Sequence, residues 1–128
     1  MNQFSKSYNL EERTAKLGEN IIKFCRSVKG DYVVNPIINQ VIRAVTGIGA
    51  NYCEANNASS KKDFRNKIYI CKKEAQESKY WLRMLLTALP GQEDEIKILL
   101  SEVQELILIF QKICNTLNQG KSSSEIEN

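Results

Sequence analysis

The sequence predicts an all-α protein, an up-down-up-down antiparallel four-helix bundle. Two prolines and six glycines in 128 residues are few for a sheet protein with many turns. Four segments carry apolar residues at helical spacing, and the connections between them are short. With 42% apolar and 26% charged residues, the chain fits one globular domain with a single core. We expect that domain to span residues 1–118.

The first two helices are expected over about residues 10–29 and 35–55. Asn9 followed by Glu12 forms a capping-box-like start, and Gly30 offers a C-terminal stop. Asn35-Pro36 provides an N-cap and first-turn pair for the second helix. The apolar positions then fall on one side of each helix, which is the pattern of a helix packed against a core.

The last two helices are expected over about residues 61–89 and 92–118. Ser60 with Asp63 makes a capping start, and Pro90-Gly91 breaks the third helix. The fourth helix carries a regular apolar seam and ends near Asn118. Residues 119–128 hold too little apolar surface to offset the entropy of ordering them, so we predict a disordered polar tail.

Composition narrows the chemistry that the chain can perform. The chain has no histidine, which excludes an imidazole base, a catalytic Ser-His-Asp or Cys-His set and a histidine-ligated zinc. Glu74 and Glu77 are spaced i, i+3, but di-iron bundles use Glu-x-x-His. No glycine-rich loop precedes a helix in a phosphate-cradling pattern. We therefore expect no catalytic residues, no metal, no cofactor and no enzymatic activity.

Cysteine usage and hydropathy predict the compartment. The four cysteines are isolated, with no Cys-x-x-Cys pair, which is typical of small buried residues in a reducing environment. The first residues contain no apolar signal region, and no apolar stretch approaches the roughly 20 residues that span a bilayer. We expect a cytoplasmic protein that makes no membrane contact.

A family resemblance lies between Gln40 and Leu82, which read QVIRAVTGIGANYCEANNASSKKDFRNKIYICKKEAQESKYWL. The segment resembles the four-helix bundle family named after the protein encoded in intervening sequences of bacterial 23S ribosomal RNA genes. The matching elements are Gln40, Arg43, Gly49-Ala50-Asn51, Glu54-Ala55, Ser60, Lys62-Asp63-Phe64, Lys67, Glu74-Ala75, Glu77 and Trp81-Leu82. Thr46 stands where the family usually has serine, which retains the hydroxyl.

The resemblance implies a small bundle that assembles into a homopentamer, in a family whose biochemical role is largely unassigned. A related branch comprises accessory proteins of diversity-generating retroelements. Those proteins use a basic surface to bind nucleic acid and a reverse transcriptase. We expect this chain to be closer to the intervening-sequence type, with the retroelement activity as a further option. A reverse transcriptase or another protein is then a candidate partner beside RNA or DNA.

Most matching polar residues form two facing stripes. On an ideal helix Gln40, Arg43, Gly47, Asn51 and Glu54 span an arc of roughly 80°, opposite the apolar face. Folding the second and third helices back on each other brings this stripe level with Lys67, Glu74, Glu77 and Trp81. We predict a partly buried polar network in which Arg43 pairs with Glu74. Further predicted members are Glu77, level with Gln40, as a further acceptor, Asn51 as a partner of Lys67, and Gly47 as the point of close approach. The network either sets register or a subunit interface, or it binds a ligand.

A second stripe on the third helix is the candidate nucleic-acid surface. Its five cations project within an arc of roughly 40°: Lys61, Arg65, Lys72, Lys79 and Arg83. Tyr69 and Tyr80 lie near it and offer rings on which bases can stack. Residues 56–83 carry eight Lys/Arg against three Asp/Glu, whereas residues 84–128 carry three against seven. The stripe is therefore a phosphate track, a solvated face, or the partner of the acidic fourth helix.

The fourth helix also carries Ile98, Leu108 and Ile109 outside its seam, which favours self-association. The alternative is that the tail or the first helix covers them. These inferences combine into a non-enzymatic, oligomeric scaffold or weak, sequence-independent nucleic-acid-binding accessory protein. The main alternative is a protein-protein adaptor with no nucleic-acid contact, followed by a small ligand-binding bundle.

Overall fold

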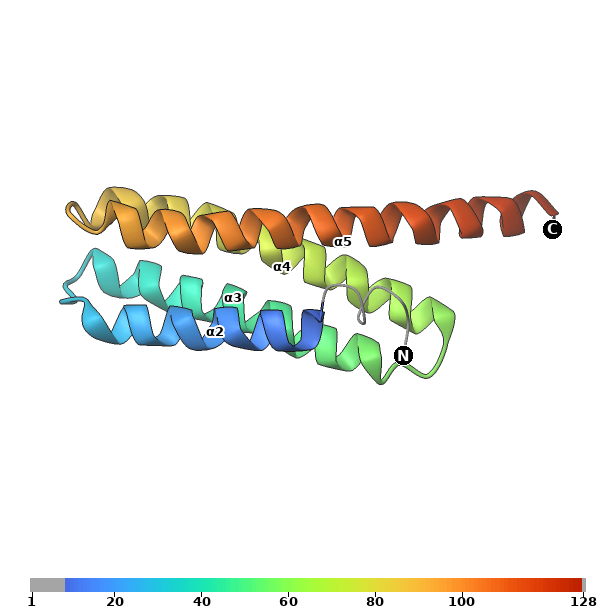
Figure 1. The fold of residues 1–128 in the computed structure, drawn as a ribbon, viewed down its shortest axis with the longest axis horizontal. Helices are drawn as coiled ribbons and strands as arrows, with labels where there is room; N and C mark the ends of the chain where they lie inside the picture. The colour runs from blue at the N-terminus through green and yellow to red at the C-terminus, as the bar shows by residue number, and fades with distance from the viewer. Residues whose placement is uncertain (1–8, 128) are drawn as a thin grey trace.

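The computed structural model describes residues 9–127, with side chains over residues 9–120. Four helices follow one another in alternating direction: α2 (Leu10–Ser27), α3 (Val34–Asn56), α4 (Lys61–Ala88) and α5 (Glu93–Glu127) (Figure 1). The described part of the chain contains no strand. The predicted all-α, up-down-up-down four-helix bundle is confirmed.

The helix starts only partly follow the predicted caps. Ser60 caps α4 as expected, because its hydroxyl accepts a hydrogen bond from the Asp63 amide at 3.0 Å. The predicted capping box at Asn9 is wrong: Asn9 adopts a left-handed conformation, φ 48° and ψ 52°, and its side chain makes no capping bond. α3 begins one residue before Asn35, and Asp31 Oδ1 accepts from the amides of Val33 and Val34 at 2.9 and 2.8 Å. A loop carboxylate, rather than Asn35, therefore satisfies these free amides.

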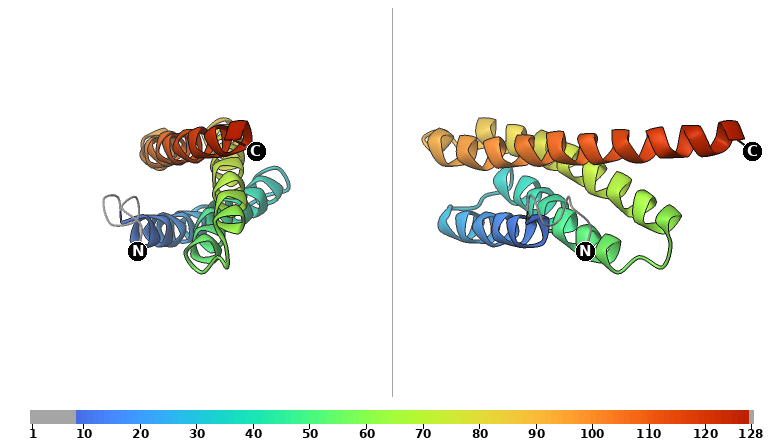
Figure 2. Two further views of the ribbon diagram at one scale, coloured as in Figure 1. Left: turned by 90° about the vertical axis from the view of Figure 1, so that its right-hand side faces the viewer. Right: turned by 45° about the vertical axis from the view of Figure 1, so that its right-hand side comes forward.

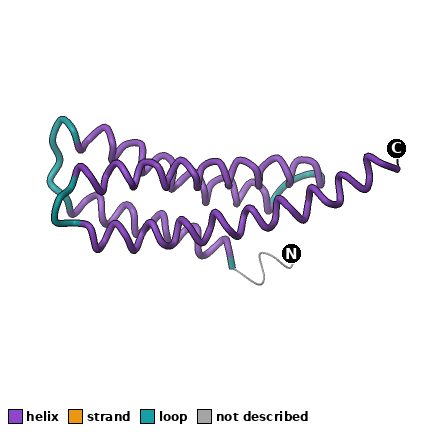
Figure 3. Tube along the Cα trace, turned by 90° about the horizontal axis from the view of Figure 1, so that it is seen from above, coloured by secondary structure: helices purple, strands orange, loops and turns teal. Residues whose placement is uncertain are grey.

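The last helix is longer than the sequence predicts. α5 continues nine residues past Asn118, to Glu127, and it projects beyond the other helices (Figure 3). The predicted disordered tail at 119–128 falls on this extension, whose backbone is helical as far as Glu127. The side chains of 121–128, and Asn128 altogether, lie outside the described residues. The separate disordered tail stays a prediction.

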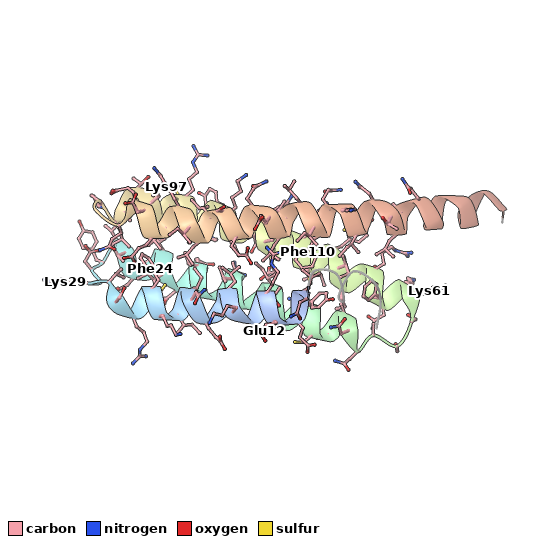
Figure 4. All side chains as sticks on the ribbon, in the orientation of Figure 1. Glu12, Phe24, Lys29, Lys61, Lys97 and Phe110 are labelled. Carbon is pink, nitrogen blue, oxygen red and sulfur yellow. The ribbon has the colours of Figure 1, made fainter. Side chains whose placement is uncertain are left out.

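The core is built from the apolar stripes of all four helices. Tyr52, Phe110, Leu82 and Ile21 are among its largest fully buried side chains. Each fully buried side chain of this size contributes about 1.5–3 kcal/mol relative to exposure. Figure 4 places Phe24 and Phe110 between the helix layers and Lys61 at the outer end of α4. The same apolar periodicity that predicts each helix thus supplies the buried face.

Small residues bring α2 and α3 close together. A Cβ atom added at Gly49 would lie 3.3 Å from the Thr14 hydroxyl oxygen, which is a tight contact, so a larger residue would require the Thr14 side chain to shift slightly. The Thr14 hydroxyl donates to the Leu10 carbonyl at 2.7 Å, within its own helix. Thr46 likewise donates to the Ile42 carbonyl at 2.6 Å. The buried Thr14 hydroxyl and the half-buried Thr46 hydroxyl are therefore satisfied without a partner on the facing helix.

The four helices do not enclose the core equally on all sides. α4 packs extensively on both α3 and α5, and α2 packs on α3, whereas α2 and α5 meet only briefly. Figure 2 shows α4 lying between α5 and the pair formed by α2 and α3. α4 consequently carries two sets of predicted site residues. Lys67, Glu74 and Glu77 lie along α3, and the basic stripe lies on the side of α5.

Candidate functional site

The structure brings most of the predicted polar network together along the contact between α3 and α4, which we call the polar seam. It comprises Gln40, Arg43, Asn51, Glu54, Lys67, Glu74, Glu77 and Trp81. Arg43 lies at its centre and donates to Glu77 Oε2 at 2.8 Å and to Gln40 Oε1 at 2.9 Å. The Glu74 carboxylate is 3.5 Å from the same guanidinium. Glu77, predicted as the secondary acceptor, is therefore the closer partner of Arg43.

Glu74 is the most buried carboxylate of the polar seam. Its side chain is 14% exposed, against 35% for Glu77 and 49% for Arg43. Burial, followed by the charge of Glu77, raises the pKa of Glu74, and the opposing attraction of Arg43 does not cancel this effect. Glu77 in turn is the main cause of a raised pKa at Arg43. The prediction of a partly buried network thus applies to Glu74 but not to Arg43, which is half exposed.

Gly47 makes room for the Glu74 carboxylate, as the sequence predicts. A Cβ atom at this position would lie 2.2 Å from Glu74 Oε2, well inside van der Waals contact. Any larger residue would therefore push the carboxylate away from its present place near Arg43.

The far end of the polar seam differs from the prediction. Lys67 pairs with Glu54 Oε1 at 3.3 Å, and Asn51 donates to the Gly47 carbonyl of its own helix at 2.8 Å. The predicted contact between Asn51 and Lys67 is thus not formed, because a carboxylate one turn further along α3 offers Lys67 a charged acceptor. Trp81 is half-buried against the core and meets Tyr80 edge-on, with ring centroids 5.1 Å apart.

The basic stripe, Lys61, Arg65, Lys72, Lys79 and Arg83, lies on the side of α4 away from the polar seam. Lys61, Lys79 and Arg83 are exposed, while Arg65 and Lys72 are half-buried. Lys72 donates to Gln111 Oε1 on α5 at 3.0 Å and lies 6.0 Å from the centre of the Tyr69 ring. Tyr69 also hydrogen-bonds to Asn118, whereas Tyr80 is 53% exposed. Tyr80 is therefore the more accessible of the two predicted stacking rings.

The acidic residues of α5 do not neutralise the basic stripe. Within residues 9–120, none of the five cations forms an ion pair. Glu102 instead pairs with Arg13 of α2 at 2.7 Å, and Glu105 joins the same guanidinium at 3.0 Å. These bonds raise the pKa of Arg13, with Glu102 as the largest cause. Sequence reasoning missed this pairing because no local spacing links residue 13 to residues 102 and 105.

Beyond Arg13, the opening between α2 and α5 forms a shallow cleft of about 370 Å³. Its walls include Phe24 and Asn20 from α2 and Ile98, Leu99 and Glu95 from α5.

Residues with a described placement include no cluster of three potential metal-ligating side chains. No described helix is long and apolar enough to cross a membrane.

The fold and the polar seam define a class of protein: a small antiparallel four-helix bundle with a charged contact between its second and third helices. The chain belongs to the 23S rRNA-intervening sequence protein family, whose model matches residues 6–112. A crystal structure of a protein of unknown function from the S23 ribosomal protein family of Bacteroides thetaiotaomicron VPI-5482 is similar, with a TM-score of 0.71 and 26% identity. The alignment covers 81% of this chain and 96% of that one. No curated protein matches the chain.

Proposed function

We propose that this protein is a non-enzymatic, oligomeric helical scaffold that binds nucleic acid weakly and without sequence preference through the basic stripe. The observation that carries the proposal is the absence of carboxylate partners for the stripe among residues 9–120. An uncancelled row of cations is suited to phosphate, since each contact releases counterions and carries no sequence information.

The proposed assembly is a homo-oligomer, and the family resemblance implies five copies. Ile98 and Leu108 of α5 are 71% and 61% exposed, which supports burial against another copy. The four thiols are unpaired, which supports a reducing, cytoplasmic location. RNA or DNA is the proposed ligand, and a reverse transcriptase or another protein is a further partner by resemblance.

A protein-protein adaptor is the second candidate function. The cleft between α2 and α5 and the exposed Tyr32, at 90%, favour it, because both offer apolar surface to a partner. Salt dependence separates the two functions, since counterion release on phosphate binding makes affinity fall steeply with salt.

Fluorescence anisotropy tests the proposal. Labelled structured RNA and labelled single-stranded DNA are titrated with the native protein, the Lys72→Glu/Lys79→Glu variant and a Lys16→Glu/Lys29→Glu control. The control reverses two exposed charges away from α4. We expect binding that weakens steeply with salt, that is lost in the stripe variant and that largely survives in the control. Absence of binding by the native protein at low salt would overturn nucleic-acid contact and favour the adaptor.

A further inference from the structure

Lys72 lies at the contact between α4 and α5, where its neighbours are neutral groups and not carboxylates. Its two neighbours there are the Gln111 amide oxygen, at 3.0 Å, and the Tyr69 ring. Both are uncharged, so they hold the ammonium in place without neutralising it. The nearby Cys114 thiol does not supply an anion either, because burial raises its pKa. Lys72 therefore combines a constrained position with the absence of a carboxylate partner among residues 9–120.

The direction of the hydrogen bonds beyond Lys72 follows from its chemistry. An ammonium has three N–H donors and no acceptor, so Gln111 must present its oxygen to it. The Gln111 Nε2 group then points the other way and donates to Asn115 Oδ1 at 2.7 Å. Asn115 has thereby used its oxygen, and its own NH₂ group has no partner among residues 9–120. Each bond in this chain occupies an amide oxygen, and it ends at the NH₂ group of Asn115, an exposed residue.

The same residue types recur one heptad away, although no bond joins them in the structure. Gln104 lies seven residues before Gln111, and Lys79 lies seven residues after Lys72. In an antiparallel helix pair, equal heptad steps in opposite directions bring these two positions onto the same stretch of the contact. Gln104 Oε1 is buried and lacks a hydrogen-bond partner in the described part of the chain. A buried carbonyl oxygen needs a donor, and Lys79, which is exposed and makes no bond to Gln104 in the structure, is the cation one heptad from Lys72. Seven residues of helix separate the two lysines by about 10.5 Å.

We infer that Lys72, Lys79, Gln104, Gln111 and Asn115 form a donor-only face along the α4–α5 contact that binds the phosphodiester backbone of a nucleic acid. The inference rests on the proposed function and adds α5 to the binding surface, with Gln104 and Gln111 as positioning residues. Phosphate oxygens accept hydrogen bonds and do not donate them, so they are the natural complement of such a face. A glutamate at position 111 would also accept a hydrogen bond from Lys72, but it would cancel the charge of the lysine.

Gln111→Glu tests the donor-only face, because it changes one amide into a carboxylate beside Lys72. We expect weaker binding of the labelled structured RNA and a fall in the salt slope of log K by about 0.7–0.9, the loss of one phosphate contact. Asn39→Asp, which adds the same charge at an exposed position on α3, is the matched control and should leave the slope unchanged. A double-mutant cycle with Lys72→Met and Gln111→Leu, followed by urea unfolding without RNA, measures the contact itself and should give a coupling distinguishable from zero.

The outcomes separate this inference from the proposed function. Equal effects of Gln111→Glu and Asn39→Asp on RNA binding, together with zero coupling, would overturn the donor-only face. The proposed function would still stand in that case if Lys72→Glu/Lys79→Glu abolished binding. A selective effect of Gln111→Glu with measurable coupling supports both. Native protein that binds no RNA at low salt would overturn the proposed function and, with it, this use of the face.

Discussion

At the scale of single residues, Gly47 determines how closely α3 approaches the Glu74 carboxylate. Its missing Cβ is the space that Glu74 Oε2 occupies. A glycine inside a helix costs about 0.5–1 kcal/mol relative to alanine, so the position gives up helix stability to accommodate a charged contact. The absence of a side chain at Gly47 in α3 thus allows Glu74 of α4 to lie near Arg43.

Gly47→Ala should therefore stabilise the protein only when Glu74 is truncated. In a Glu74→Ala background we expect a gain of about 0.5–1 kcal/mol in the free energy of unfolding. In the native background the displaced carboxylate should remove that gain. Gly18→Ala is the control, because a Cβ atom at this position would lie 3.8 Å from its nearest neighbour, Thr46 Cγ2, which is an ordinary van der Waals contact. Urea unfolding measures all four variants, and an equal gain in both backgrounds would contradict the close approach.

The raised pKa of Glu74 makes a pH-dependent contribution to stability. Below the ordinary value of 4.5 the carboxyl is protonated in both the folded and the unfolded chain, so it contributes no difference. As the pH rises from there through the raised folded pKa, the unfolded chain releases its proton first, and the folded state loses stability. Above the folded pKa the loss is complete.

Glu74→Gln should thus be more stable than the native protein at neutral pH, with a difference that shrinks as the pH falls through the raised folded pKa of Glu74 towards 4.5. Thermal unfolding over a series of pH values measures this difference. Glu77→Gln provides the contrast, since it weakens the 2.8 Å bond to Arg43 and should lower stability at neutral pH. A Glu74→Gln variant that is less stable at pH 7 than at pH 4, relative to the native protein, would contradict the assignment.

At the scale of the helices, each ion pair joins α3 to α4 or α2 to α5 within residues 9–120. The α4–α5 contact relies on apolar packing and neutral amides instead. Arg13 is the main polar link between α2 and α5, which otherwise meet over a short stretch. The Arg13 guanidinium donates two hydrogen bonds to the Glu102 carboxylate. This bidentate geometry restricts the relative positions of α2 and α5.

Arg13→Met should loosen α2 while leaving the α3–α4 contact intact. We expect a loss of about 1 kcal/mol in the free energy of unfolding, since the pair is partly exposed. Amide hydrogen exchange should accelerate along α2 more than along α4. Lys16→Met, an exposed change on the same helix, is the control. Uniform acceleration over all helices, or none, would show that Arg13 does not hold this contact.

At the scale of the whole molecule, exposed apolar residues on α5 predict assembly. Leu108 is 61% exposed in the single chain, which is costly for a leucine in water. Light scattering of the native protein should give a mass several times 14.6 kDa, and the family resemblance predicts five copies. Leu108→Glu should lower that mass, whereas Ser101→Glu adds the same charge on an exposed position of α5 without removing apolar surface. A native protein that runs as a monomer at micromolar concentration would contradict assembly.

Much of the polar seam was predictable because it depends on one short connection. Residues 56–60 allow α3 and α4 only to fold back on each other, and helical spacing then brings Arg43 level with Glu74 and Glu77. Which of the two carboxylates lies closer depends on differences of less than an ångström in side-chain placement. Lys67 illustrates the same limit, since both Asn51 and Glu54 are within its reach on an ideal helix.

By itself, the sequence determined four amphipathic helices, their order and alternating direction, the cap at Ser60 and the family. These properties follow from periodicity, turn residues and local spacing, all of which act within one or two neighbouring segments. Only the tertiary structure decided that Arg13 pairs with Glu102 and Glu105 of α5 and that Lys72 contacts the neutral amide of Gln111. It also decided that a cleft remains between α2 and α5. Those outcomes depend on which distant side chains meet and in what register, and no local pattern encodes a contact between residues almost 90 positions apart.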